Sequence, residues 1–128
     1  MADIFIRKQK IRPGKTERLR EWITEMHDAA SREAAQDIWA AESLHTISLF
    51  IEHADDGDYF VWFLEAESME QLIEARRAST HPLHDVEDEM MEDVLEDPEE
   101  AGDFEPLLHG VSSERPNEYI VERYSDES

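Results

Sequence analysis

Apolar and polar positions are arranged around a sharp turn near the middle of the chain. The dipeptide Asp56-Gly57 separates two runs rich in β-branched and aromatic residues, 45–53 and 59–65. Such a dipeptide is typical of a two-residue type I′ turn, whose central residues need positive φ. The pattern therefore predicts a β-hairpin over residues 45–65.

The two strands of this hairpin are apolar on both faces. A two-residue loop sets Asp55 opposite Asp58 and Ile51 opposite Trp62, and opposed residues share a face. One face then consists of Ile47, Leu49, Ile51, Phe60, Trp62 and Leu64, with His53 at its end. The other face consists of Phe50, Tyr59, Val61 and Phe63, mixed with Ser48, Glu52 and Glu65. Since antiparallel sheets often leave one face in water, two apolar faces predict two covering layers.

A strand and a long helix are expected before the hairpin. Residues 3–11 alternate between apolar and polar side chains, and Arg12-Pro13-Gly14 ends this first strand. From Leu19 onward, apolar residues recur at intervals of three and four, which predicts a helix from Thr16 to about residue 42 with a bend near 31–33.

Two helices and a weak strand are expected after the hairpin. Ser68 with Gln71 forms a capping box, which predicts a helix over 69–79. A further helix over 82–95 begins with a proline, which the first turn tolerates. Its expected inner face consists of Leu83, Val86, Met90 and Val94. The segment 104–111 contains a proline and predicts a fourth strand at a sheet edge.

This order, βαββαβ, predicts an α+β, ferredoxin-like domain over residues 1–111, with an antiparallel sheet and both helical regions on one face. Residues 112–128 form a C-terminal extension, in which 119–124 is a candidate for a short extra strand. Nothing in the chain is left to cover the Phe50 and Phe63 face. A second copy packed sheet to sheet is the economical answer, so we expect a homodimer.

Composition narrows the classes of function. The chain has 33 acidic and 12 basic residues, a formal charge of -21, and no cysteine, which excludes disulfides and thiolate chemistry. No face can present the positive stripe that nucleic acid needs, and no apolar run predicts a membrane span or a signal peptide. We expect a cytoplasmic protein without nucleic-acid or membrane partners.

A candidate ligand site lies between the sheet and the helices. His53 ends the helix-facing side of the hairpin, near Phe60 and Trp62, and its imidazole suits a general base or a ligand anchor. Trp22 and His81 are expected to complete the pocket. The structural alternatives are a strand-end histidine bonded to Asp55 or Asp58 and tryptophans that belong to the core.

Two further groups of polar residues have a structural alternative. His81 and His84, with Asp85 and Asp88, form a helix face able to hold a divalent ion, or else they offset the helix dipole. We therefore assign no metal, and His84 is kept as a ligand-binding candidate.

A second group lies on the sheet. If Phe5, Arg7 and Gln9 share the outer face, Arg7 forms an ion pair there with Glu52 or Glu65; paired-carboxylate catalysis is the alternative.

Three stretches resemble a family of uncharacterised small proteins from halophilic archaea, within the dimeric α+β barrel superfamily: residues 5–19, 50–59 and 79–82. The resemblance covers about residues 3 to 110. It implies the barrel fold, a homodimer and a small-molecule pocket. The most specific activity that it implies is cofactor-free, monooxygenase-like conversion of a partly apolar metabolite. A non-catalytic stress-response or regulatory dimer is the alternative. Some relatives bind heme through a helix histidine, but few arginines are free here for its propionates, so we expect no cofactor.

The acid-rich, lysine-poor composition suggests a protein kept in molar salt, where the Debye length falls to about 3 Å. We expect the melting temperature to rise between dilute buffer and molar KCl, because screening relieves the self-repulsion of the -21 charge. Thermal melts monitored by circular dichroism check this. A melting temperature independent of KCl would contradict adaptation to salt.

Overall fold

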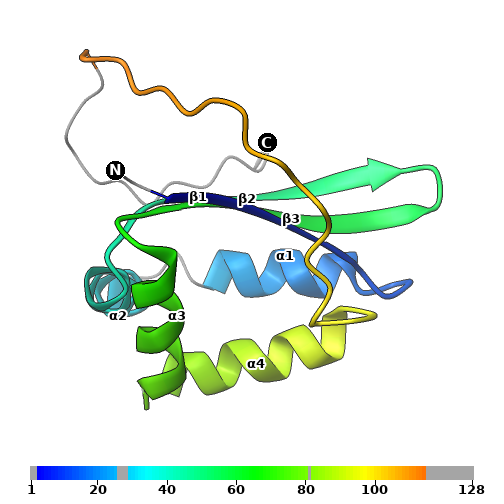
Figure 1. Cartoon of the computed structure of the whole chain (residues 1–128). Coiled ribbons are helices and arrows are strands. Elements are labelled where there is room, and N and C mark those ends of the chain that lie inside the picture. Colours follow the sequence, from blue (N-terminus) through cyan, green and yellow to red (C-terminus); the bar gives the residue numbers. More distant parts are fainter. Residues whose placement is uncertain (1–2, 26–28, 81, 115–128) are drawn as a thin grey trace.

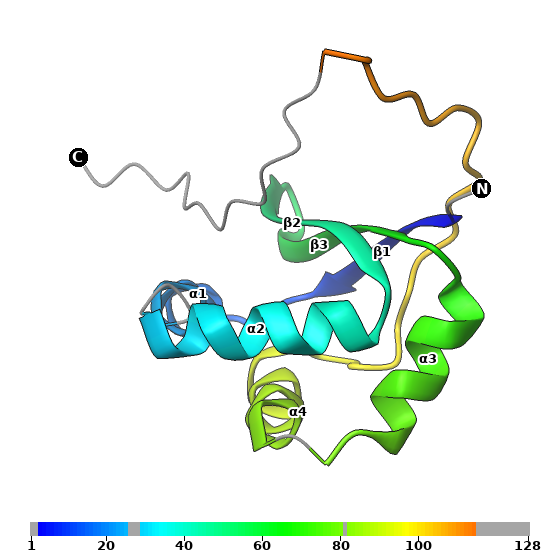
Figure 2. The ribbon, with the colours of Figure 1, turned by 90° about the vertical axis from the view of Figure 1, so that its left-hand side faces the viewer.

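A computed structural model of the chain describes residues 3–25, 29–80 and 82–114. Within these residues a sheet is covered on one face by helices, and the segment after the last helix passes to the other face (Figures 1 and 2). The strands are β1 (Asp3–Lys10), β2 (Leu44–Ala54) and β3 (Gly57–Ala66); the helices are α1 (Thr16–Glu25), α2 (Ala29–Ala41), α3 (Met69–Ala78) and α4 (Pro82–Val94). None of these helices is long and apolar enough to cross a membrane.

The three strands form one antiparallel sheet in the order β1-β3-β2. The protein is thus a small α+β fold with its helices on one side of the sheet, as expected. The single long helix expected after β1 is instead two helices, α1 and α2, and residues 26–28 between them lie outside the described part.

The hairpin pairs with a register two residues away from the predicted one. Ala54 lies opposite Gly57 and Ile51 opposite Phe60, so the loop is Asp55-Asp56. Among the described residues the positive φ falls on Gly57 (134°) and not on either aspartate, so the turn is not type I′. Because side chains alternate with a period of two, a two-residue shift leaves each one on its predicted face.

The core lies between the helix-facing side of the sheet and helices α1 and α4. Its buried members are Ile11, Leu19, Trp22, Phe60, Met90, Met91, Val94 and Leu95. On α4 the predicted inner face is partly wrong, because Val86 is 47% exposed while His84 is buried. Polar side chains therefore take inner positions at the start of this helix.

The fourth strand predicted over 104–111 is absent from the described residues. The chain after α4 instead follows the free edge of β1, where Glu96 N donates to Lys10 O and Lys8 N donates to Ala101 O, both at 3.0 Å. At Gly102, where φ is +82°, a Cβ would lie 2.6 Å from the Phe104 ring, so glycine permits this turn. Beyond it, residues 102–114, which we call the arm, leave the edge and cross to the outer face of the sheet (Figure 1).

The side chain of Gln9 fixes this segment to the sheet. It is 1% exposed; its Nε2 donates to the Pro98 carbonyl at 2.7 Å, and its Oε1 accepts from Trp62 Nε1 at 2.9 Å. Arg7 adds bonds to the carbonyls of Pro98 (2.7 Å) and Glu100 (3.1 Å). Both amide ends of the buried glutamine are thus satisfied, as burial requires.

These contacts put Arg7 and Gln9 on the opposite face from the one that the expected ion pair of Arg7 required. Gln9 is paired with Phe60 and Arg7 with Trp62, which puts both on the helix-facing side. Lys8 takes the outer position instead and pairs with Glu52 at 2.7 Å. The expected ion pair of Arg7 with Glu52 or Glu65 is therefore wrong.

Replacing Gln9 by leucine keeps the side-chain volume but removes the acceptor for the Trp62 N–H, while Arg7 still serves the Pro98 carbonyl. A buried donor left without a partner costs about 1–3 kcal/mol, so we expect the free energy of unfolding to fall by about 2 kcal/mol in guanidinium titrations. Gln36→Leu, at an exposed position on α2, is the control, with an expected change below about 0.5 kcal/mol. Equal losses in the two variants would contradict a structural role for Gln9.

Candidate functional site

The aromatic residues predicted to line a helix-side pocket lie in or beside the core. Phe60 is 1% exposed and Trp22 7%. The Trp62 ring packs against Phe60 with centroids 4.7 Å apart, and its N–H is used by Gln9. These three residues come together, but as packed core.

The predicted histidines are not brought together. His53 lies at the hairpin tip, where its side chain is 63% exposed and Nδ1 is 2.8 Å from Asp58 Oδ1. His84 is buried at the start of α4, which Figure 1 places at the opposite end of the molecule. His81 lies outside the described residues. His53 and His84, which the sequence predicts as candidates in two different groups, thus lie far apart in the described part of the structure.

The helix face proposed for a divalent ion is also divided. Arg76 pairs with Glu87 at 2.9 Å and with Asp88 at 2.7 Å, so Asp88 is engaged by a cation of the protein itself. Across residues 3–25, 29–80 and 82–114, no three histidine or carboxylate side chains are grouped as metal ligands.

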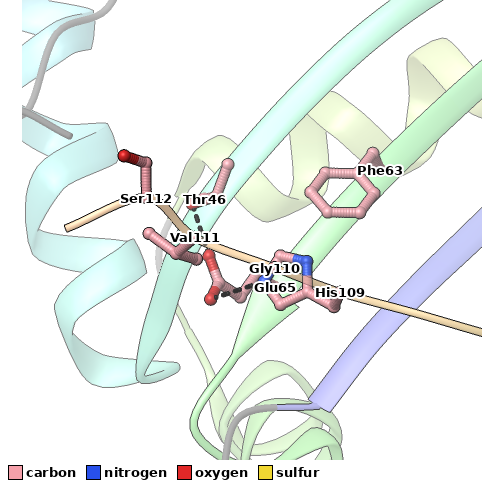
Figure 3. A pocket seen from close by; sticks show the side chains of 7 residues that line it. All are labelled: Thr46, Phe63, Glu65, His109, Gly110, Val111 and Ser112. Atoms are coloured by element: carbon pink, nitrogen blue, oxygen red, sulfur yellow. Dashed lines mark hydrogen bonds and ion pairs between the residues drawn. The ribbon is translucent and has the colours of Figure 1, made fainter. Parts of the chain in front are cut away.

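A pocket of about 300 Å³ lies on the outer face of the sheet, where the arm passes over β2 and β3 (Figure 3). It is lined by Thr46, Phe63, Glu65, His109, Gly110, Val111 and Ser112. Thr46 Oγ1 donates to Glu65 Oε1 at 2.7 Å, and His109 Nε2 lies 3.0 Å from Glu65 Oε2. Thr46 is the cross-strand partner of Glu65, so the pairing of β2 with β3 brings these two side chains together. The arm supplies His109.

Glu65 is an ionised carboxylate in a nearly buried position, 6% exposed. The hydrogen bond from Thr46 is the main cause that lowers its pKa; it outweighs desolvation, and the bond from His109 adds to it. Because the pKa lies below the ordinary value, Glu65 carries its charge at neutral pH. The stability linked to this charge is present above the ordinary carboxyl pKa and is lost as the pH falls through the lowered one.

The chemistry of His109 follows from its bond to Glu65. An ionised carboxylate only accepts, so the proton in this contact belongs to Nε2, and Nδ1 of a neutral ring is an acceptor. Figure 3 shows the second ring nitrogen on the side away from Glu65, and the Phe63 ring lies 6.1 Å from the imidazole, centroid to centroid. The site thus offers the imidazole Nδ1 as an acceptor beside an apolar wall, an arrangement suited to binding a hydrogen-bond donor and accepting its proton.

Sequence reasoning missed this site because 44 residues separate Glu65 from His109. It placed Glu65 on the outer face correctly but gave Arg7 as the ion-pair partner of either Glu52 or Glu65, and it did not consider His109. The local signal is weak: a histidine and a glycine within the otherwise apolar run 107–111.

A second buried polar group lies within the helical layer. Glu42, just after α2, is 8% exposed, and its Oε2 is 3.9 Å from His84 Nε2. Desolvation raises the pKa of Glu42 to about 7, with Glu87 adding to the rise and Arg76 opposing it. Burial likewise raises the pKa of Glu87, which Arg76 opposes.

The fold and the outer-face pocket together define a small α+β protein with a three-stranded antiparallel sheet and an arm that crosses part of its open face. The chain belongs to DUF6176, a family of unknown function, whose family model matches residues 2–115. Comparison with curated proteins and with solved structures finds no match.

The raised pKa of Glu42 predicts a pH-dependent stability. Its folded value of about 7 exceeds the ordinary 4.5, so the linked stability is full below 4.5 and is lost as the pH rises through about 7. Glu42→Gln, which mimics the neutral acid, should therefore raise the melting temperature near pH 8 and leave it unchanged near pH 4. The control is Glu70→Gln, an exposed position on α3. A gain of the same size at both pH values would contradict the burial argument.

Proposed function

We propose that the protein binds a small, partly apolar molecule in the outer-face pocket without a bound cofactor, and that Glu65 and His109 anchor it. One observation carries this proposal: a buried, ionised carboxylate, bonded to a hydroxyl and an imidazole, opens onto a cavity of about 300 Å³. This volume is at the lower end of small-molecule sites. The ligand is accordingly a compact metabolite.

Conversion of the ligand uses the same groups. Glu65 holds the Nε2 proton of His109, and Nδ1 then accepts a proton from the bound molecule, as in other general-base pairs. This site replaces the helix-side pocket expected from the sequence as our proposal, because Trp22 and Phe60 fill that space and His53 points to solvent at the hairpin tip.

Saturation-transfer NMR with a set of small aromatic and aliphatic compounds tests the site. We expect bound compounds to lose at least about tenfold in affinity in His109→Leu, the loss of one hydrogen bond to a charged or polar group. His53→Leu, an exposed histidine at the far end of the sheet, is the control and should bind normally. Loss of binding in His53→Leu alone would instead favour the helix-side site.

A second candidate is a non-catalytic module whose homodimer is the functional unit. It is supported by the charge of the outer face. The strand positions on this face are Ile4, Ile6, Lys8, Lys10, Thr46, Ser48, Phe50, Glu52, Tyr59, Val61, Phe63 and Glu65. Two lysines and two glutamates sum to zero, in a chain of charge -21. Two such chains approach at least cost through a neutral face.

Apolar exposure on the same face supports this arrangement. Phe50 is 55% exposed and Ile6 38%, and a second sheet would cover both, as in the dimeric α+β barrel that the sequence resembles. The two candidates are compatible, because a second copy would close the pocket from above.

Light scattering in molar KCl separates this candidate from a monomeric binding protein. We expect a dimer for the native chain and a monomer for Phe50→Glu. Dimerisation would bury the introduced carboxylate between two sheets without a partner of opposite charge, which is costly. Ile73→Glu, at a position 44% exposed on α3, is the control and should remain a dimer. A monomeric native chain would exclude the dimer module.

A further inference from the structure

We propose that the arm is the element through which two copies of this chain dock, with Leu107 and Leu108 of each copy packing on the sheet of the other. The inference rests on the homodimer candidate above and names the residues that anchor it. It follows from three features of the outer face: the exposure of these leucines, the half of the sheet that the arm leaves open, and the charge of that half.

Leu107 and Leu108 are the most exposed large apolar side chains among the described residues, at 87% and 88%. Single exposed apolar residues are ordinary on a protein surface, whereas adjacent ones mark a contact site. The chain is held on both sides of them: β1 fixes it at Ala101, and His109 meets Glu65 at 3.0 Å directly after them. The arm thus presents both leucines at a fixed place outside the core of their own chain.

The arm covers one end of the outer face. His109 meets Glu65 and Phe63 there, and Figure 1 shows the arm running above the sheet toward the end away from the β2–β3 turn. The half nearer that turn, which we call the open half, consists of the strand positions Lys8, Lys10, Phe50, Glu52, Tyr59 and Val61. The described residues leave Phe50 55% exposed in it. Each chain thus carries protruding apolar side chains toward one end of the face and an open apolar surface at the other.

These two surfaces match each other in a symmetric pair. A two-fold axis that lies between two sheets and runs across their strands brings the arm of each copy over the open half of the other, so the contact is made twice. Packed sheets lie about 10 Å apart, and two bare sheets cannot reach this spacing where an arm lies between them. The arms therefore belong to any interface that two outer faces form.

The open half suits a partner as acidic as this chain. It holds two of the three lysines, and Lys8 pairs with Glu52 at 2.7 Å and Lys10 with Asp56 at 3.5 Å, so these charges cancel. A basic partner is drawn to the acidic surfaces of a chain of charge -21, whereas a second copy is repelled by them. Residues 106–113 of the arm contain no carboxylate, so a second copy meets least repulsion where this segment reaches the open half.

Cysteine cross-linking tests the contact, because the chain has no cysteine of its own. Leu108→Cys and Phe50→Cys are prepared as separate proteins, mixed in molar KCl until their subunits exchange, and oxidised. A disulfide between the two variants then joins two copies and never two parts of one chain. We expect a cross-linked dimer on non-reducing gels, with mass spectrometry identifying the joined peptides. Ile73→Cys on α3, mixed with Phe50→Cys, is the control and should not cross-link.

Leu107→Ser combined with Leu108→Ser measures how much the leucines contribute. Both copies lose two buried leucines, so the dissociation constant of the dimer should rise by at least about a hundredfold. Sedimentation of a dilution series in molar KCl gives this constant. Ile73→Ser combined with Val86→Ser, exposed aliphatic positions on α3 and α4, is the matched control and should leave it unchanged. Circular dichroism of the arm variant should match that of the native chain, since its leucines lie outside the described core.

The outcomes distinguish the arm from the dimer itself. A native chain that stays monomeric overturns both the homodimer candidate and this inference. A native dimer that Phe50→Glu dissociates, but that the serine variant of the arm does not weaken, leaves the homodimer standing and overturns the role of the arm. Cross-linking of Leu108→Cys to itself, with none to Phe50→Cys, also overturns it, because the two arms then meet each other and not the open halves.

Discussion

Two hydrogen bonds of the Gln9 side chain hold the chain after α4 against the sheet, and the course of the arm depends on them. A glutamine that is 1% exposed must have both ends of its amide bonded, and here one end meets the Trp62 indole and the other the Pro98 carbonyl. The first bond fixes the orientation of β1 against β3. The second holds residues 95–101 along the edge of β1, so that the sheet edge is covered and the chain leaves it at Gly102.

The candidate site is a consequence of that arrangement. The arm starts from a fixed point at the edge of β1, crosses the open face of the sheet and brings His109 to Glu65, while the hairpin brings Thr46 to the same carboxylate. The bond from Thr46, and then that from His109, lower the pKa of this carboxylate against the effect of its desolvation. The strand positions on the face that carries it hold two lysines and two glutamates, so they have no net formal charge in a strongly acidic chain.

Local patterns predicted much of the fold. The hairpin had the right two faces although its register was wrong by two residues, because an even shift preserves the alternation. Ser68 caps α3 as expected, accepting a bond from Gln71 N, and Pro82 begins α4. In β1 and α4 the prediction failed because the same sequence pattern fits two orientations of the element. In β1, apolar residues occupy both faces, so its orientation was ambiguous, and in α4 the polar His84 replaced the apolar Val86 at an inner position.

The sequence by itself determined the α+β class, the helices on one side of the sheet and the acidic surface, since each depends on neighbours within a few residues. Only the tertiary structure decided where function is to be sought. Gln9 and Pro98 are 89 positions apart and Glu65 and His109 are 44 apart, and no local periodicity links residues at such separations. Their meeting depends on hydrogen bonds that form when burial leaves a polar group no water to bond with.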